Sequence, residues 1–232
     1  MPTLLRLAVV LLSAGVVVAE PPEPTLRLPG LRVDRETGSV LVDARVVGQD
    51  ADWLELIACT PNSREHEALV VVDALPSHVH LALATLGAEA GQPQTARQLG
   101  PGEWQTDPAR GPEIAISAIV ERLDGPEETP LHAWYAVGPR DVPAASPAPP
   151  PDRFLFTGSV TRTHQGQTHY LADLSGSVIS LVHFGDETIA RRTDLTQDTD
   201  GQALQPTALV PPNGTPVTLR LRPIAPVPES AD

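Results

Sequence analysis

The chain has 232 residues, of which 29 are Asp or Glu and 16 are Lys or Arg, so its formal net charge is −13 at pH 7. Nucleic acids and anionic lipids are bound by clustered cationic side chains, so this acidic composition excludes DNA and RNA as partners. The single cysteine excludes an internal disulfide, and the fold must therefore rest on buried apolar area.

The first 19 residues have the pattern of a secretory signal peptide. Arg6 precedes an apolar run over residues 7–19, and the small residues Val17 and Ala19 at its end suit signal peptidase. The run is shorter than the roughly 20 apolar residues that cross a bilayer, with an uncleaved anchor as the alternative. We expect an exported protein, periplasmic or secreted, that is soluble and has no stable membrane insertion after cleavage. The mature charge would be 15 − 29 = −14, because cleavage removes one Arg and no acid.

Residues 20–142 form a β-rich N-terminal part. Alternating apolar and polar residues on both sides of the sequence DRETG predict a hairpin with Gly38 in the left-handed conformation. A second antiparallel pair is expected through the loop 61–64, and a third across the acidic turn DGPEET. The strands predicted in this part cover residues 25–33, 39–47, 53–59, 66–73, 113–121 and 131–137.

One helix is predicted clearly, over residues 76–86. Pro76 suits its first turn, Ser77 is a candidate cap, and Gly87 is a stop signal. One stripe of this helix is apolar and should face a sheet. The stripe consists of Val79, Ala82, Leu83 and Leu86.

Residues 143–151 are rich in Pro and Ala and predict an extended, exposed linker. Residues 152–226 form a C-terminal β part, which either completes the same fold or is a second unit, and residues 227–232 are a tail. The strands predicted in the C-terminal part cover residues 153–161, 167–173, 176–184 and 215–223, and a weaker helix is predicted over 186–192. The elements together predict an α+β fold, a mainly antiparallel β-sheet with the 76–86 helix packed on it.

Three segments carry a family resemblance: LELIACTPNSREHEALVVVDALPSHVHLALATLGAEAG, then YLADLSGSVISLVHFGDE, then GTPVTLRLRP. In this order they resemble the YdjY-domain family of exported bacterial proteins, over nearly the whole mature chain. The resemblance implies export and implies no particular reaction. A ferredoxin-like label sometimes attached to this family would require about four cysteines for an iron–sulfur cluster. Because the chain has Cys59 alone, we expect no such cluster.

Residues 58–80 bring Cys, His and Glu close together in the sequence. If the strands around the loop 61–64 pair antiparallel, Cys59 lies opposite His66, with Cβ atoms roughly 4.5–5.5 Å apart. Glu67 then ends an apolar face and needs a partner for its charge, which Arg64 or a histidine would supply. The N-terminus of the predicted helix adds free backbone N–H groups that favour an anion.

Three functions fit this segment. The one we expect is that the protein is a non-catalytic binding or assembly module for an unknown protein or small molecule, with its site in residues 58–80. The candidate ligand-binding residues are Cys59, Arg64, His66, Glu67, Ser77, His78 and His80.

The two alternatives are a metal-binding protein and a thiol enzyme. A metal such as Zn(II) would be bound by His66, His78 or His80, with Cys59 or Glu67. Two residues apart on a helix, His78 and His80 point about 200° away from each other, so both reach one ion only if His78 precedes the regular turns. A thiol enzyme would use Cys59 as nucleophile, His66 as base and Glu67 to orient the base.

Overall fold

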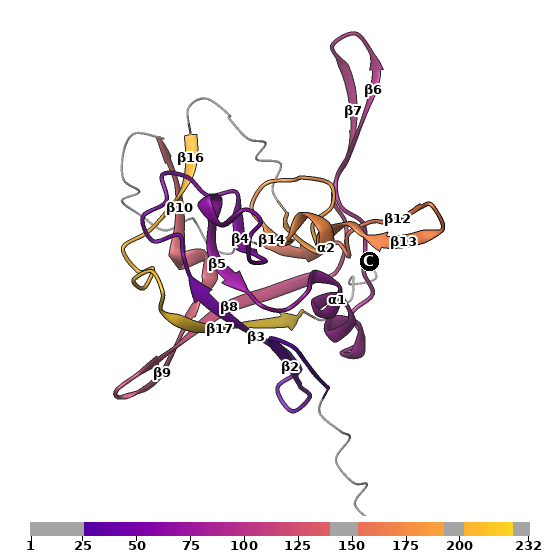
Figure 1. Cartoon of the computed structure of the whole chain (residues 1–232). Helices are drawn as coiled ribbons and strands as arrows, with labels where there is room; N and C mark the ends of the chain where they lie inside the picture. Colours follow the sequence, from indigo (N-terminus) through magenta and orange to yellow (C-terminus); the bar gives the residue numbers. More distant parts are fainter. Residues whose placement is uncertain (1–25, 140–152, 193–201, 225–232) are drawn as a thin grey trace, which may run out of the picture.

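The computed structural model describes residues 26–139, 153–192 and 202–224 (Figure 1). Eight strands form a closed barrel: β3 (Ser39–Val46), β17 (Pro216–Pro223), β8 (Glu113–Arg122), β11 (Phe154–Phe156), β15 (Ile189–Arg191), β14 (Ser177–Ser180), β4 (Leu56–Cys59) and β5 (Ala68–Val72). They are hydrogen-bonded in this order, and β5 returns to pair with β3. The prediction of an α+β sheet with one packed helix is therefore wrong.

The barrel closes because β3 has different neighbours along its two halves. One edge of β3 pairs with β17, while the other pairs first with β2 (Leu31–Asp34) and then with β5. Val33 lies opposite Val40 in the first half, and Ala44 lies opposite Val72 in the second. Closure satisfies the backbone groups that an open sheet would leave at its edges.

Helix is a minor part of the described residues. It consists of α1 (Pro76–Thr85), the short α2 (Leu171–Ser175) and two 3₁₀ turns, η1 (Glu65–Glu67) and η2 (Leu131–Trp134). The predicted 76–86 helix is confirmed as α1, and Gly87 behind it has φ +84°. Its buried residues Val79, Ala82 and Leu83 belong to the same apolar core as the inward side chains of the barrel. Among the described residues, no helix has the length and apolar character needed to cross a membrane.

Strands from both sides of the predicted linker build the barrel. β3, β4, β5 and β8 precede it, and β11, β14, β15 and β17 follow it. The linker itself lies outside the described residues, as do the predicted signal peptide and the predicted tail. The described chain on either side of the linker therefore shares one core cluster.

Several local predictions are resolved by the strand register. The hairpin around DRETG is confirmed as β2–β3, with Gly38 at φ +62°, and the last predicted strand is β17. The acidic segment DGPEET is mostly strand, because β9 (Gly125–Pro130) runs through it and pairs with β8, and the turn lies at residues 123–124. The expected pairing of 113–121 with 131–137 is therefore wrong, since 131–137 form η2 and part of a strand that pairs elsewhere. The weaker helix predicted over 186–192 is also wrong, since β15 occupies its centre.

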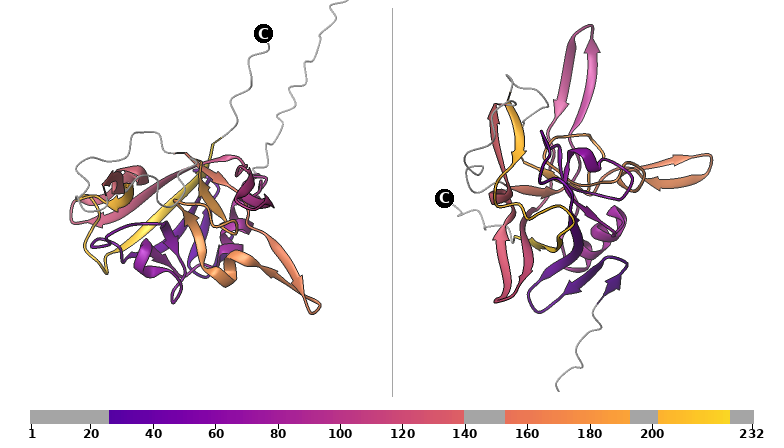
Figure 2. Two further views of the ribbon diagram at one scale, coloured as in Figure 1. Left: turned by 90° about the horizontal axis from the view of Figure 1, so that it is seen from above. Right: turned by 60° about the vertical axis from the view of Figure 1, so that its left-hand side comes forward.

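Further hairpins project from the barrel (Figures 1 and 2). β6 (Thr95–Gly100) and β7 (Glu103–Asp107) form a long arm, and β12 (Thr161–His164) and β13 (Gln167–Tyr170) form a second one. β10 (Tyr135–Pro139) pairs with β16 (Gln202–Pro206), and β1 (Arg27–Leu28) pairs with β2. The two arms leave the barrel in different directions, as the right-hand view of Figure 2 shows.

Candidate functional site

The expected pairing of Cys59 with His66 is wrong. β4 and β5 run parallel, and Cys59 lies opposite Val71 rather than opposite His66. His66 is in η1, on the connection that carries the chain back to the start of β5, and 71% of its side chain is exposed. The all-apolar sequences of the two strands suit burial on both faces, which is typical of parallel pairs.

Cys59 is fully buried and belongs to a second, small apolar cluster on β4 and β5. Leu56, Ala68 and Val71 complete this cluster, and Phe184 packs against it. Burial raises the pKa of the Cys59 thiol above its usual value. A thiol that is enclosed and protonated is a poor nucleophile, so this environment does not favour a thiol enzyme.

Glu67 has the two partners expected for it. Its carboxylate lies 3.7 Å from the Arg64 guanidinium and 3.8 Å from His66 Nε2, and only 11% of its side chain is exposed. The Arg64 guanidinium also lies over the Phe184 ring, 3.8 Å from its centroid. These contacts tie η1 to the loop between β14 and β15, which carries Phe184, and this is a structural role.

The N-terminus of α1 already has an internal partner. Leu75 is its N-cap, and no side chain caps it at that residue, so Ser77 is not the cap. The Ser77 backbone N–H instead donates to Asp173 Oδ1 of α2, at 2.8 Å. Since a carboxylate of the chain occupies the place where an anion was expected, this helix end is not an open anion site.

His78 and His80 do not converge on a common centre. His78 Nδ1 is a buried atom without a hydrogen-bond partner among the described residues. His80 Nδ1 lies 3.2 Å from the Gly158 carbonyl oxygen and 3.1 Å from the Tyr170 hydroxyl. Within the described ranges, no three His, Cys, Asp or Glu side chains are grouped so that they could hold a metal ion. The structure therefore does not assemble His66, His78 and His80 into one site.

His80 belongs to a half-buried polar cluster that the sequence did not reveal. The Tyr170 hydroxyl links His80 Nδ1 to Thr188 Oγ1, which lies 3.1 Å away. The His80 ring also meets Phe156 edge-on, with centroids 4.9 Å apart. Burial raises the pKa of Tyr170 well above its usual value, so the phenol stays protonated and keeps its proton for hydrogen bonding.

Glu187 is the second part of this cluster and is fully buried. Its Oε2 atom accepts the backbone N–H groups of Phe184, Gly185 and Asp186, at 3.1, 2.8 and 3.1 Å. Its Oε1 atom lies 3.4 Å from His183 Nδ1. Successive N–H groups that surround one anion form a nest, and here the chain supplies the anion itself. The sequence HFGDE, with its glycine and following acids, was the signal for this loop.

The chemistry of the cluster is structural. The Glu187 carboxylate bonds within its own loop, whereas the Tyr170 hydroxyl bridges α1 and the start of β15. Thr157 Oγ1 adds bonds of 2.7 and 3.0 Å to the carbonyl oxygens of Glu187 and Thr188. No Ser, Thr or Cys nucleophile with an adjacent base is formed by these described contacts. The cluster therefore holds the loop before β15 in place.

The YdjY domain model matches residues 31–222. The chain belongs to the YdjY domain family. The resemblance seen in the sequence is confirmed, and the match extends from β2 to β17. No curated protein and no solved structure matches the chain.

Within the described part of the YdjY domain, the β6–β7 arm projects well away from the barrel (Figure 1). All its strand residues are exposed except Gly100, which is half-buried. Leu99 is 54% exposed and Trp104 is 60% exposed. Trp104 lies opposite Gln98. Leu99 follows Gln98 at a register shift between the two strands, so both apolar side chains lie near the tip of the arm.

The base of this arm is held closely. The backbones of Gln92 and Arg110 exchange two hydrogen bonds of 2.9 Å, and the Gly91 N–H donates to the Phe156 carbonyl oxygen of β11. A Cβ atom at Gly91 would lie 2.0 Å from the Arg110 carbonyl oxygen, so only glycine fits there. The arm is therefore exposed along its length but fixed where it leaves the barrel.

Proposed function

We propose that this YdjY domain is an exported, acidic, non-catalytic binding module that docks a protein partner through the β6–β7 arm. The proposal keeps the binding or assembly role expected from the sequence and moves the contact from residues 58–80 to the arm. The internal contacts of the 58–80 segment support this move, because Glu67, the Ser77 N–H and His80 all have partners within the chain.

The exposure of Leu99 and Trp104 on the arm carries the proposal. A two-stranded hairpin is marginally stable by itself, because it buries little apolar surface. Trp side chains are enriched among the residues that dominate protein interfaces. A partner that covers the tip would bury both side chains and add to the stability of the arm.

The backbone of the arm also suits a protein partner. Among the described strands, β6 and β7 pair only with each other, so their outer edges present backbone N–H and C=O groups. A strand of another protein can add to such an edge. The charged residues of the two strands are Arg97, Glu103 and Asp107, which give no cationic patch for a nucleic acid or an anionic membrane.

Site-specific crosslinking tests the docking. A photo-reactive amino acid replaces Leu99 at the arm tip and, in a control variant, Leu123 at the fully exposed β8–β9 turn. We expect position 99 to give an adduct of defined mass with one protein in the producing bacterium, and Trp104→Ala to abolish it. Equal adducts from both positions, or an adduct that persists in Trp104→Ala, would contradict the proposal.

Export is tested by the N-terminus of the mature protein. We expect cleavage after Ala19, so that the recovered chain begins at Glu20 and is found outside the cytoplasm. A chain that keeps Met1 and remains in the membrane fraction would instead support the uncleaved anchor. This outcome is independent of the arm, because the crosslinking experiment works with either form.

A further inference from the structure

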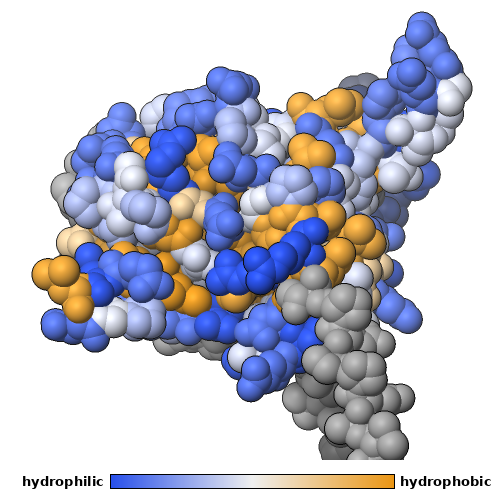
Figure 3. Space-filling view, turned by 60° about the horizontal axis from the view of Figure 1, so that its bottom comes forward, coloured by the Kyte–Doolittle hydropathy of each residue, from blue (hydrophilic) through white to orange (hydrophobic). Residues whose placement is uncertain are grey.

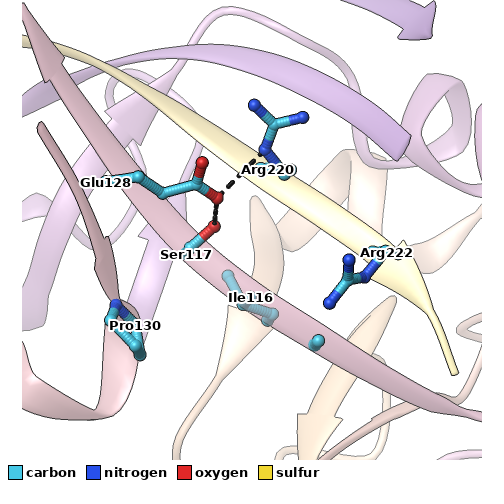
Figure 4. Close-up of a pocket in the computed structure, with 7 residues that line it drawn as sticks. Ile116, Ser117, Glu128, Pro130, Arg220 and Arg222 are labelled. Atoms are coloured by element: carbon cyan, nitrogen blue, oxygen red, sulfur yellow. Dashed lines mark hydrogen bonds and ion pairs between the residues drawn. The ribbon is translucent and has the colours of Figure 1, made fainter. Parts of the chain in front are cut away.

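A groove lies on the outer surface of the barrel, over β8, β9 and β17 (Figure 4). It has a volume of about 410 Å³. Ala115 and Ser117 of β8 are small, and they lie between Pro130 of β9 and two arginines of β17, Arg220 and Arg222. Larger side chains on the neighbouring strands therefore flank a strand with small outward ones, which produces the hollow.

The strand register fixes which side chains point into this groove. Inward residues of β8 and β17 belong to the apolar core, and the outward residues alternate with them. Arg220 lies directly opposite Ser117, and Arg222 lies directly opposite Ala115. Both arginines thus lie on the β17 side of the groove, and Figure 4 shows Arg220 beside Glu128 and Arg222 further along the strand.

The two arginines differ in their partners. Arg220 Nε donates to Glu128 Oε1 at 3.0 Å, and the Ser117 hydroxyl donates to the same oxygen at 2.5 Å. Arg222 has no ion pair or hydrogen bond among the described residues and is exposed. Arg220, Arg222 and Glu128 together carry a formal charge of +1, on a chain whose net charge is −13.

We propose that this groove binds the carboxylate of a monoanionic ligand with an apolar body. Arg222 presents the two parallel N–H groups that bind a carboxylate in bidentate geometry. The charge of +1 is neutralised by one carboxylate, and Glu128 repels a second negative charge. Ala115 and Pro130 contribute apolar surface that contacts the body of the ligand.

In Figure 1, β9 and β17 lie toward the lower side of the molecule, which has a mixed surface. In the view turned toward the lower side of the molecule, hydrophobic residues form patches that are crossed by strongly hydrophilic ones (Figure 3). A ligand with one charged end and an apolar body matches this mixture. The groove and the β6–β7 arm lie at different places on the barrel (Figure 1), so this site goes beyond the docking function.

Two sources provide this chemistry: the C-terminus of a peptide and a free organic acid. N-acetyl-phenylalanine represents the first and benzoate the second, and the amide of each is a neutral control of nearly the same shape. Binding is followed by isothermal titration calorimetry and by the shift of the Ala115 methyl signal. We expect at least one of the two acids to bind and its amide to bind about tenfold more weakly.

Two matched variants locate the site. Arg222→Gln removes the guanidinium with no described partner, and Arg45→Gln makes the same charge change at another exposed position, on neighbouring β3. We expect Arg222→Gln to weaken binding about tenfold and Arg45→Gln to leave it unchanged within twofold. The acid that binds more tightly identifies the source.

Three outcomes would overturn the proposal. They are equal binding of acid and amide, equal loss in the two arginine variants, and the absence of binding by either acid at millimolar concentration. None of them bears on the arm, because crosslinking at position 99 is measured independently. Failure of the groove and failure of the docking function are therefore distinguishable.

Discussion

The polar cluster around Tyr170 and Glu187 and the exposed β6–β7 arm use their side chains in opposite ways. In the cluster, the polar groups are at least half-buried and have hydrogen-bond partners within the chain. On the arm, the apolar side chains Leu99 and Trp104 are open to solvent. Buried polar groups with internal partners indicate a role in the fold, whereas a Trp and a Leu exposed together at one hairpin tip are the feature on which the proposed docking rests.

Glu187→Ala should have the largest effect on stability and tests the structural half of this comparison. The substitution leaves the backbone N–H groups of Phe184, Gly185 and Asp186 without their acceptor. We expect the free energy of unfolding to fall by about 3–5 kcal/mol, measured by urea denaturation. Glu187→Gln keeps an acceptor oxygen and should lose roughly half as much. A cost below about 1 kcal/mol for both variants would show that the nest does not hold this loop.

Gly91→Ala tests how firmly the arm is fixed at its base. The added methyl group would overlap the Arg110 carbonyl oxygen, so the backbone must shift, at a cost of about 2–3 kcal/mol. Gly100→Ala is the matched control near the arm tip, where the nearest heavy atom is the Glu103 Oε2 atom at 3.6 Å. Thermal unfolding should separate the two variants clearly. If their stabilities are equal, the close approach at Gly91 does not constrain the arm.

Tyr170→Phe should cost about 1 kcal/mol at pH 8, because it removes the hydroxyl between His80 and Thr188. Its sharper signature is the dependence of stability on pH. Burial raises the pKa of Tyr170 in the folded state, so the folded protein holds the phenol proton more tightly than the unfolded chain. This contribution is complete below the unfolded pKa of about 10 and is lost as the pH rises above it.

Urea denaturation at pH 8 and at pH 10.5–11 measures this dependence. The wild type should lose more stability over that interval than Tyr170→Phe. Tyr135, the other tyrosine, is present in both proteins, so its own titration cancels in the comparison. Parallel losses in the two proteins would place the Tyr170 hydroxyl in water rather than in the cluster.

Local chemistry explains which elements could be predicted from the sequence. Some residues set the backbone conformation of the segment in which they stand. Examples are Gly38 at the DRETG turn, Pro76 at the start of α1 and Gly87 just after its end. The alternation in β17 likewise follows from one face being buried. These signals need no knowledge of distant segments.

Barrel closure depends on pairings that no local pattern encodes. β4 and β5 are apolar throughout, so alternation could set neither their direction nor their register. The change of neighbour along β3, from β2 to β5, brings Ala44 beside Val72 and has no signal in either strand alone. The same holds for the polar cluster, where His80 and Tyr170 meet across 90 residues. The β6–β7 hairpin, in contrast, could have been predicted from the sequence, because Pro101-Gly102 is a turn signal.

Trp104→Ala should have the smallest effect on stability and tests the binding half of the comparison. Its side chain is 60% exposed on a hairpin outside the barrel, so we expect a change below about 0.5 kcal/mol. Trp134 is the internal control, because it is 1% exposed, and its replacement by Ala should cost about 3–5 kcal/mol. Urea denaturation of both variants gives the contrast. A cost above about 1 kcal/mol for Trp104→Ala would mean that the arm packs on its own protein in solution, and its exposed tip would then no longer support docking.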